Sequence, residues 1–197
     1  MRFLLFLACF SLLCSGDGKI KNFVVVMLEN NSFDRIFGTL KGVKGLTGKE
    51  FNLDLNNKPV FVAPAKRYVR MCNPDHSVQA TTFKLFGFPV PNFKQNASMS
   101  GFVRWEQAMK KHEDGCNTLH FFNETDLPVF HFLAKQGVLF DQMFASLPGP
   151  TWPNRWFTLL GTSGGLTDTG DWNDFTTGRL FKQRSILDQV HDAGMTW

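Results

Sequence analysis

The sequence has little excess charge of either sign and no apolar run long enough to cross a membrane. Its 21 basic and 17 acidic residues leave a formal net charge of +4, and the basic residues are scattered along the chain. Nucleic-acid-binding domains usually concentrate basic residues in one patch, so we expect no nucleic-acid partner. The longest apolar run, residues 3–14, is too short for a membrane-spanning helix. Peripheral contact with a membrane surface stays open, because a weak net positive charge attracts anionic surfaces.

The amino terminus has the pattern of a secretory signal peptide. Arg2 precedes the apolar run 3–14, and the small residues Gly16 and Gly18 follow it. We expect residues 1–18 to be removed, residues 19–197 to form one exported domain, and the protein to be secreted, with no transmembrane segment in the mature chain.

Cysteine is scarce in the mature part of the chain. Four cysteines are present, and Cys9 and Cys14 belong to the leader, which leaves Cys72 and Cys116. In an oxidising compartment these two could form a disulfide, and two separate buried thiols are equally compatible with the sequence.

Local patterns predict strands that alternate with helices. The β-branched run Phe23–Leu28 predicts a strand buried on both faces, and Val138–Phe140 predicts another. Capping and glycine signals predict four helical segments: a short one between Ser32 and Gly38, Ser77–Phe86, Asp126–Gln136 with Asp126 as its cap and Phe130, Leu133 and Ala134 on one face, and one from Ser185 to Gly194. This alternation is typical of an α/β domain with a mixed or parallel sheet flanked by helices.

The octapeptide PGPTWPNR, residues 148–155, is typical of a segment that presents a nucleophile. Each proline fixes its own φ and restricts the residue before it, so the backbone around Thr151 has little freedom. By itself such a stretch is more often a rigid surface turn.

A second motif, Glu29-Asn30, follows the first predicted strand. Ligands of open α/β sheets bind at the carboxyl ends of strands, and a carboxylate beside an amide oxygen suits a divalent cation. The same residues could instead satisfy backbone groups in a capped turn, and this motif alone favours neither interpretation.

Several segments, in order along the chain, resemble the phosphoesterase family that includes bacterial phospholipase C, plant non-specific phospholipase C and a group of acid phosphatases, and that is related to the alkaline phosphatase superfamily. The matching segments are VVVMLENNSFDRIFGTL (24–40), NPDHSVQA (73–80), MSGFV (99–103), LPVFHFLAKQGVLFDQMFASLPGPTWPNRWF (127–157), GTSGG (161–165) and SILDQVHDAGMTW (185–197). The resemblance implies an alkaline-phosphatase-like fold of which this chain is the amino-terminal part. Because the chain ends just after a helix terminator, where another strand would follow, we expect it to be truncated.

The resemblance also implies roles for individual residues. Thr151 would be the nucleophile, and Glu29 and Asn30 would help to hold the phosphate and a divalent metal of unknown identity. Arg155 would order the loop, and a contact with the phosphate stays open for it. His76 would lie near the substrate oxygens as a donor or general acid, although a histidine beside an aspartate is more often only a structural hydrogen-bond pair.

Three functions remain open at this point. The first is a secreted hydrolase of phosphoric esters that acts on a phosphate ester or phospholipid through Thr151. The second is a non-catalytic secreted fragment that binds a phosphorylated ligand or a partner. The third and weakest is a serine esterase, because residues 161–165 fit GxSxG with Ser163 as nucleophile, although the loop-like sequence after Ser163 does not suit the strand and helix that this motif requires.

Overall fold

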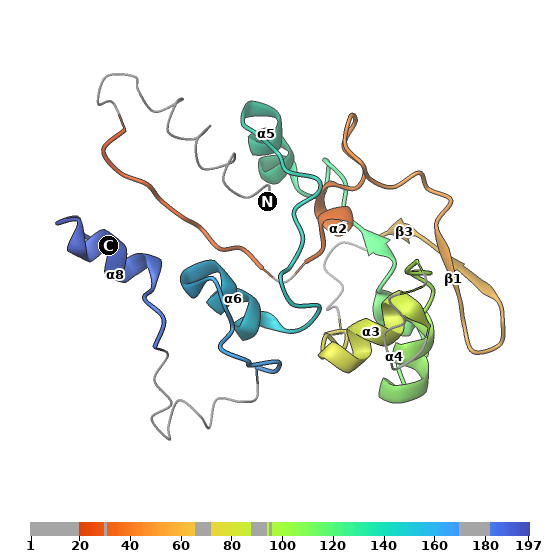
Figure 1. Cartoon of the computed structure of the whole chain (residues 1–197). Helices are drawn as coiled ribbons and strands as arrows, with labels where there is room; N and C mark the ends of the chain where they lie inside the picture. The colour runs from red at the N-terminus through yellow and green to blue at the C-terminus, as the bar shows by residue number, and fades with distance from the viewer. Residues whose placement is uncertain (1–19, 30, 66–71, 88–93, 95, 170–181) are drawn as a thin grey trace. The chain divides into compact units, whose positions relative to one another are not determined.

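The computed structural model describes residues 20–29, 31–65, 72–87, 94, 96–169 and 182–197 (Figure 1). The chain divides into an amino-terminal unit, residues 1–30, and a main unit, residues 31–197. The predicted signal peptide lies outside the described residues. Within the described residues, no helix combines the length and the apolar character needed to cross a bilayer.

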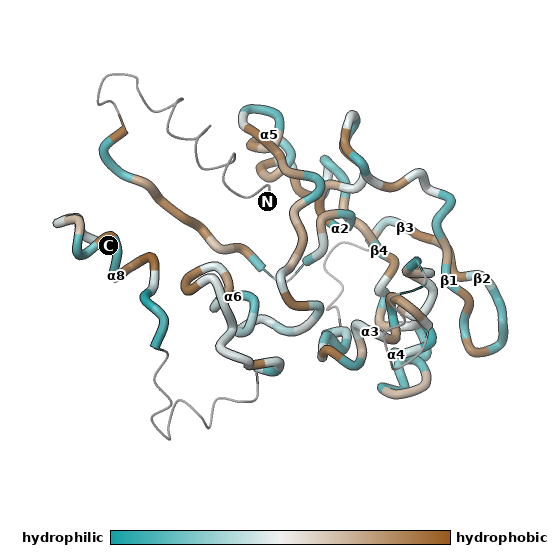
Figure 2. The backbone as a smooth tube through the Cα atoms, in the orientation of Figure 1, coloured by the Kyte–Doolittle hydropathy of each residue, from teal (hydrophilic) through white to brown (hydrophobic). Residues whose placement is uncertain are grey.

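The described part of the amino-terminal unit is an extended, exposed segment. Residues 23–28 form a continuous hydrophobic run (Figure 2), yet Val24 and Val25 are 86% and 85% exposed. The prediction of a buried strand here is wrong, because no ladder partner for this run occurs among the residues that the structure describes. A β-branched run favours extended backbone, but a strand also needs a neighbour that satisfies its hydrogen bonds.

The main unit alternates helices with short strands, which confirms the α/β class. Its elements are α2 (Phe33–Phe37), β1 (Phe51–Leu53), β2 (Pro59–Phe61), β3 (Ala63–Pro64), α3 (Val78–Phe86), α4 (Phe102–Lys110), the 3₁₀ turn η1 (Gly115–Asn117), β4 (His120–Phe121), α5 (Pro128–Gln136), α6 (Thr151–Leu160) and α8 (Ile186–Asp192). In this part of the chain, β1 pairs with β2 in an antiparallel ladder, and β3 pairs with β4 in a parallel one. The strand predicted at 138–140 is not formed, and that segment is irregular.

Serine caps explain three of the helix starts. The hydroxyls of Ser32 and Ser77 accept hydrogen bonds from main-chain N–H groups of the first turns of α2 and α3. Ser185 and Asp188 form a reciprocal capping box at the start of α8. These three helices begin where the sequence predicts.

Helix α5 begins and packs differently from the prediction. Its cap is Leu127, which makes no side-chain hydrogen bond, and the Asp126 carboxylate instead accepts from the Asn123 N–H. The predicted apolar face is not the buried one, since Leu133 is 61% exposed and His131 is 1% exposed. His131 Nε2 lies 2.9 Å from the Ile36 carbonyl oxygen, so this histidine joins α5 to α2.

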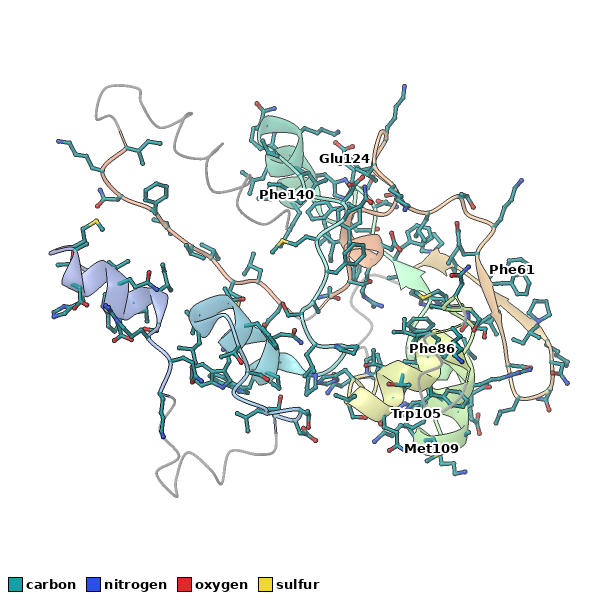
Figure 3. The ribbon with its side chains drawn as sticks, in the orientation of Figure 1. Phe61, Phe86, Trp105, Met109, Glu124 and Phe140 are labelled. Carbon is teal, nitrogen blue, oxygen red and sulfur yellow. A yellow bond between two sulfur atoms is a disulfide. The ribbon has the colours of Figure 1, made fainter. Side chains whose placement is uncertain are left out.

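Helices α3 and α4 pack against each other around the most buried residues. The ring centroids of Phe83 in α3 and Trp105 in α4 lie 5.3 Å apart, and Ala80 and Val103 are almost fully buried. Trp105 is labelled in Figure 3. Gly101 permits this approach, because a Cβ at that position would lie 2.3 Å from the Phe83 carbonyl oxygen.

A disulfide between Cys72 and Cys116 links the segment before α3 to η1 after α4. Of the two states that the sequence leaves open, the structure therefore has the paired one.

Candidate functional site

Thr151 is the first residue of α6, and the loop before it is held by a single side chain. The Asn154 amide nitrogen donates to the carbonyl oxygens of Leu147 at 3.0 Å, Gly149 at 3.2 Å and Pro150 at 3.0 Å. The Asn154 amide oxygen accepts from the Leu147 N–H at 3.0 Å. Four hydrogen bonds thus fix the backbone that leads to Thr151. Sequence reasoning did not single out Asn154, although its position three residues after Thr151, inside the proline-rich octapeptide, was a signal.

The prolines help to place the start of α6. Pro150 is the cap residue, with an extended backbone, and the helix follows it without a side-chain cap. Main-chain N–H groups of the first turn are therefore directed toward the end of the helix where Thr151 lies, an arrangement that suits an anionic group. The Trp152 N–H lies 3.4 Å from the Thr169 hydroxyl oxygen. Arg155 lies over the Trp152 ring, with 4.9 Å between the guanidinium carbon and the ring centroid.

His76 lies in the turn that precedes α3, half-buried. Its Nδ1 atom is 2.8 Å from the Pro74 carbonyl oxygen. A carbonyl can only accept, so Nδ1 carries the proton, and in the neutral ring Nε2 is the nitrogen that can accept one. The Asp75 carboxylate is engaged by other donors, namely the Ser77 N–H, the Trp105 indole N–H and Lys110. The ring is thus oriented by a main-chain carbonyl.

The loop before Thr151 and the start of α3 are in contact. A Cβ added at Gly149 would lie 2.8 Å from Val78 Cγ2, so the loop packs directly on the first residue of α3. Thr151 follows this contact by two residues along the chain, and His76 precedes it by two. The fold of the main unit thus places the segments of the predicted nucleophile and the predicted acid side by side.

The predicted metal ligands, Glu29 and Asn30, belong to the amino-terminal unit. Glu29 is exposed in the extended segment of the amino-terminal unit, and Asn30 lies outside the described residues. Their role stays a prediction, which depends on the chemistry of a carboxylate beside an amide oxygen.

Another group of metal-ligand types occurs next to α4. The ligand atoms of Cys72, His112 and Cys116 lie within 4.8 Å of one another. The two sulfur atoms are bonded to each other, so they are not thiolates, and in this form the group does not fit a metal ion.

Ser163 lies in a turn directly after α6. The serine is 6% exposed, and irregular chain follows it to Thr169. A nucleophile elbow needs a strand before the serine and a helix after it, and here a helix comes first and a loop follows. The structure therefore gives no support to a serine esterase.

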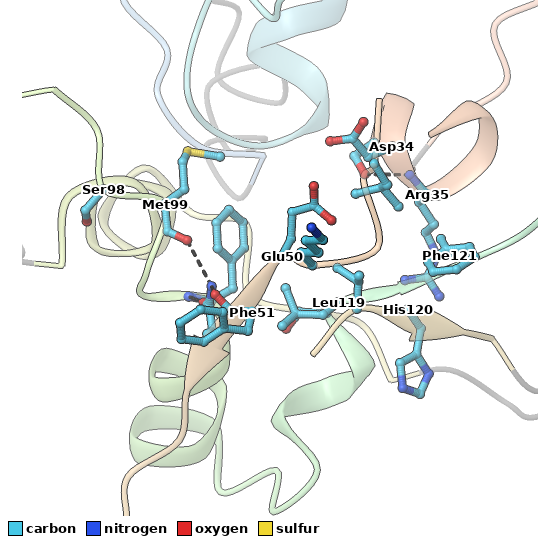
Figure 4. A pocket seen from close by; sticks show the side chains of 16 residues that line it. Asp34, Arg35, Glu50, Phe51, Ser98, Met99, Leu119, His120 and Phe121 are labelled. Carbon is cyan, nitrogen blue, oxygen red and sulfur yellow. Dashed lines mark hydrogen bonds between the residues drawn. The ribbon is translucent and has the colours of Figure 1, made fainter. Parts of the chain in front are cut away.

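A pocket of about 510 Å³, which sequence reasoning did not predict, opens between α2, β1, β4 and the segment before α4 (Figure 4). Apolar side chains such as Phe51, Met99 and Leu119 line it, and Asp34 and Glu50 bring two carboxylates to it. Hydrogen bonds from the Thr47 hydroxyl and N–H lower the pKa of Glu50 to about 2. Burial, and then the negative charge of Glu50, raise the pKa of Asp34. The only signal in the sequence was that Asp34 belongs to the ENNSFD motif.

Comparison with known proteins shows similarity to one family and to phospholipases C of plants and bacteria. The model of the Phosphoesterase family matches residues 20–197. Non-specific phospholipase C1 of Arabidopsis thaliana is 36% identical over 191 residues, which cover 92% of this chain and 34% of the relative. Non-specific phospholipase C6 of the same plant is 34% identical, and the alignment covers 89% of this chain and 33% of the relative. Hemolytic phospholipase C of Pseudomonas aeruginosa is 27% identical over 90% of this chain and 25% of its own length. The chain thus spans about a third of the length of the plant relatives.

Proposed function

Because this chain belongs to the phosphoesterase family, we propose that it hydrolyses phosphoric esters, with Thr151 as the nucleophile. Phospholipids and smaller phosphate esters are the substrates to consider, since the curated relatives are named as phospholipases C. The leader-like residues 1–18 and the Cys72–Cys116 disulfide support secretion, because disulfides persist in oxidising compartments.

One observation carries the proposal. Thr151 stands at the start of α6, on a backbone fixed by Asn154, and its loop packs on the start of α3 next to His76. A hydroxyl on a restricted backbone, at a helix start and in a loop that packs on the segment carrying an imidazole, suits phosphoryl transfer through an enzyme ester.

The first chemical step would be attack of the Thr151 oxygen on phosphorus. The Thr151 O–H bond breaks and its proton passes to bulk water, a bond from Oγ1 to phosphorus forms, and the bond from phosphorus to the leaving alkoxide breaks. His76, protonated on both ring nitrogens, would donate its Nε2 proton to the leaving oxygen. In the second step the neutral Nε2 would accept a proton from water as that water attacks the phosphothreonine. The bond from phosphorus to Thr151 Oγ1 breaks, and Oγ1 takes a proton from bulk water, which restores both the Thr151 hydroxyl and the protonated ring.

Glu29 and Asn30 would hold the divalent cation that the resemblance implies. Such a cation would favour ionisation of the Thr151 hydroxyl and stabilise charge on the phosphoryl oxygens.

The decisive experiment replaces the proposed nucleophile. We expect Thr151→Ala to lower hydrolysis of p-nitrophenyl phosphate and of phosphatidylcholine vesicles by about 10³-fold or more, because loss of a nucleophile removes the covalent path. The matched control is Thr158→Ala, an exposed threonine on the same helix, and Ser163→Ala tests the esterase alternative. Both should retain the activity of the parent chain.

Retained hydrolysis in Thr151→Ala would exclude the mechanism. The second candidate is binding of a phosphorylated ligand without hydrolysis, which the start of α6 would also serve because a helix start suits an anionic group. A parent chain that binds inorganic phosphate in calorimetry but hydrolyses neither substrate would establish it. The two assays also separate a phosphatase from a phospholipase.

A further inference from the structure

A buried ion pair lies between α3 and α4, directly under the turn that carries His76. Lys84 Nζ is 2.7 Å from Glu106 Oε1, and the two side chains are 6% and 0% exposed. Burial of two charges costs several kcal/mol unless further hydrogen bonds satisfy them, as a general estimate. The partners that satisfy these charges therefore indicate what the pair holds in place.

The pair binds both main-chain polar groups of Asp75. Glu106 Oε1 accepts from the Asp75 N–H at 2.9 Å, and Lys84 Nζ donates to the Asp75 carbonyl oxygen. The second oxygen of Glu106 lies 3.2 Å from Nδ1 of His112. An anion and a cation thus hold the two peptide groups on either side of Asp75.

These two peptide groups are the ones that precede His76. The Asp75 N–H belongs to the same peptide as the Pro74 carbonyl, and that carbonyl accepts the Nδ1 proton of His76 at 2.8 Å. A carboxylate bound to the N–H of a peptide polarises the group and makes its carbonyl a stronger acceptor. The Asp75 carbonyl, held by Lys84, belongs to the peptide that joins Asp75 to His76.

We propose that Lys84 and Glu106 are positioning residues for His76. Through the two peptides on either side of Asp75, the pair holds the proton of the neutral imidazole on Nδ1 and keeps Nε2 as the nitrogen that exchanges a proton with the substrate. This role rests on the proposed function of His76, but the state of the ring can be measured without any turnover.

The test is a ¹⁵N NMR spectrum of the His76 ring in the whole chain, at about pH 8.5, where an ordinary imidazole is neutral. The shifts of the two ring nitrogens distinguish the nitrogen that carries the proton. For the parent chain we expect the Nδ1–H form to dominate. In Lys84→Met/Glu106→Leu, which replaces both charges by apolar groups of similar size, we expect the Nδ1–H form to lose its dominance to the Nε2–H form.

The exposed pair of Lys135 and Glu124 supplies a matched control. The Lys135 side chain, on α5, is 45% exposed, and the Glu124 side chain, before α5, is 58% exposed. Lys135→Met/Glu124→Leu should leave the His76 spectrum unchanged. A buried ion pair can often be replaced by apolar residues without loss of the fold. If the double variant does not fold, Glu106→Gln decides the question, since it removes the anion but keeps an amide oxygen for the Asp75 N–H.

An unchanged Nδ1–H form in the folded double variant, or in Glu106→Gln when the double variant is unfolded, would overturn the positioning role. This result is independent of the proposed function. If the parent chain is inactive and the variant shows the expected shift of tautomer, only the hydrolase function is refuted. If the parent chain is active and the spectrum of the variant is unchanged, only the positioning role is refuted.

Discussion

At the scale of single residues, the carboxylate of Asp75 accepts several hydrogen bonds near the candidate site. Burial acts to raise the pKa of Asp75, but hydrogen bonds from the Ser77 N–H and hydroxyl, Lys110 and the Trp105 indole outweigh it and lower the pKa to about 2. The ionised form is thus stabilised by the folded turn. Because this turn also carries His76, its integrity should depend on pH in the acid range.

Asp75→Asn tests this dependence. A carboxylate with a lowered pKa in the folded state contributes stability above its unfolded pKa, near 3.8, and loses it as the pH falls toward about 2. With allowance for solvent screening, we expect the parent chain to be more stable than the variant by about 1 kcal/mol at pH 5 and to lose this advantage near pH 2. Urea unfolding at several pH values measures it.

Glu113→Gln, which removes an exposed carboxylate, is the control and should show no such change with pH. A difference between the parent chain and Asp75→Asn that stays constant from pH 5 to pH 2 would contradict the assignment.

At the scale of elements, the contact between the loop before α6 and the start of α3 depends on a glycine. Gly149→Ala would place a Cβ 2.8 Å from Val78 Cγ2 and 3.3 Å from Leu147 Cδ2. Because the stiff, β-branched Val78 side chain would have to shift to admit the new Cβ, we expect a loss of about 1–3 kcal/mol in the free energy of unfolding, a typical cost of overpacking. Thermal unfolding measures the loss.

Gly137→Ala is a suitable comparison for this variant. A Cβ at Gly137 would approach only the Leu133 carbonyl oxygen, at an ordinary 3.6 Å, and its φ of −123° suits alanine. Equal stability of the two alanine variants would mean that the loop does not pack on α3 as the structure has it.

Elements differ in how far the sequence predicts them. The starts of α2, α3 and α8 depend on serines that bond to N–H groups three residues away, so their signals are local. Helix α4 has Gly101 as its cap, without a side-chain bond, and was not predicted. The segment 23–28 was predicted as a strand because its residues favour one, but pairing depends on residues distant in sequence.

The same distinction applies to the candidate site. Thr151 and His76 could be selected from motifs, because each lies in a short segment with its own signal. The Lys84–Glu106 pair and the pocket beside Asp34 and Glu50 join residues far apart in the chain, so no local pattern shows them. The arrangement of Glu29 with Thr151 stays a prediction for the same reason.

At the scale of the whole molecule, the Cys72–Cys116 disulfide is a covalent link that the sequence alone left open. Cys72 and Cys116 are 44 residues apart, and the segment between them contains α3, α4 and His76. The described core is small, with Ala80, Val103 and Trp105 among its few buried apolar residues. A disulfide contributes most where the core contributes little, because it restricts the unfolded chain.

Cys72→Ala/Cys116→Ala should therefore lower the free energy of unfolding by about 2–4 kcal/mol, the upper figure being the loop-entropy cost for a loop of this length. Urea unfolding of the parent chain with a reducing agent should show a loss of the same size, and the reductant should not affect the double variant. Mass spectrometry after alkylation would confirm that the parent thiols are paired beforehand. A parent chain with the same unfolding midpoint in oxidising and reducing buffer would mean that packing of α3 on α4, and not the Cys72–Cys116 bond, holds the His76 turn in place.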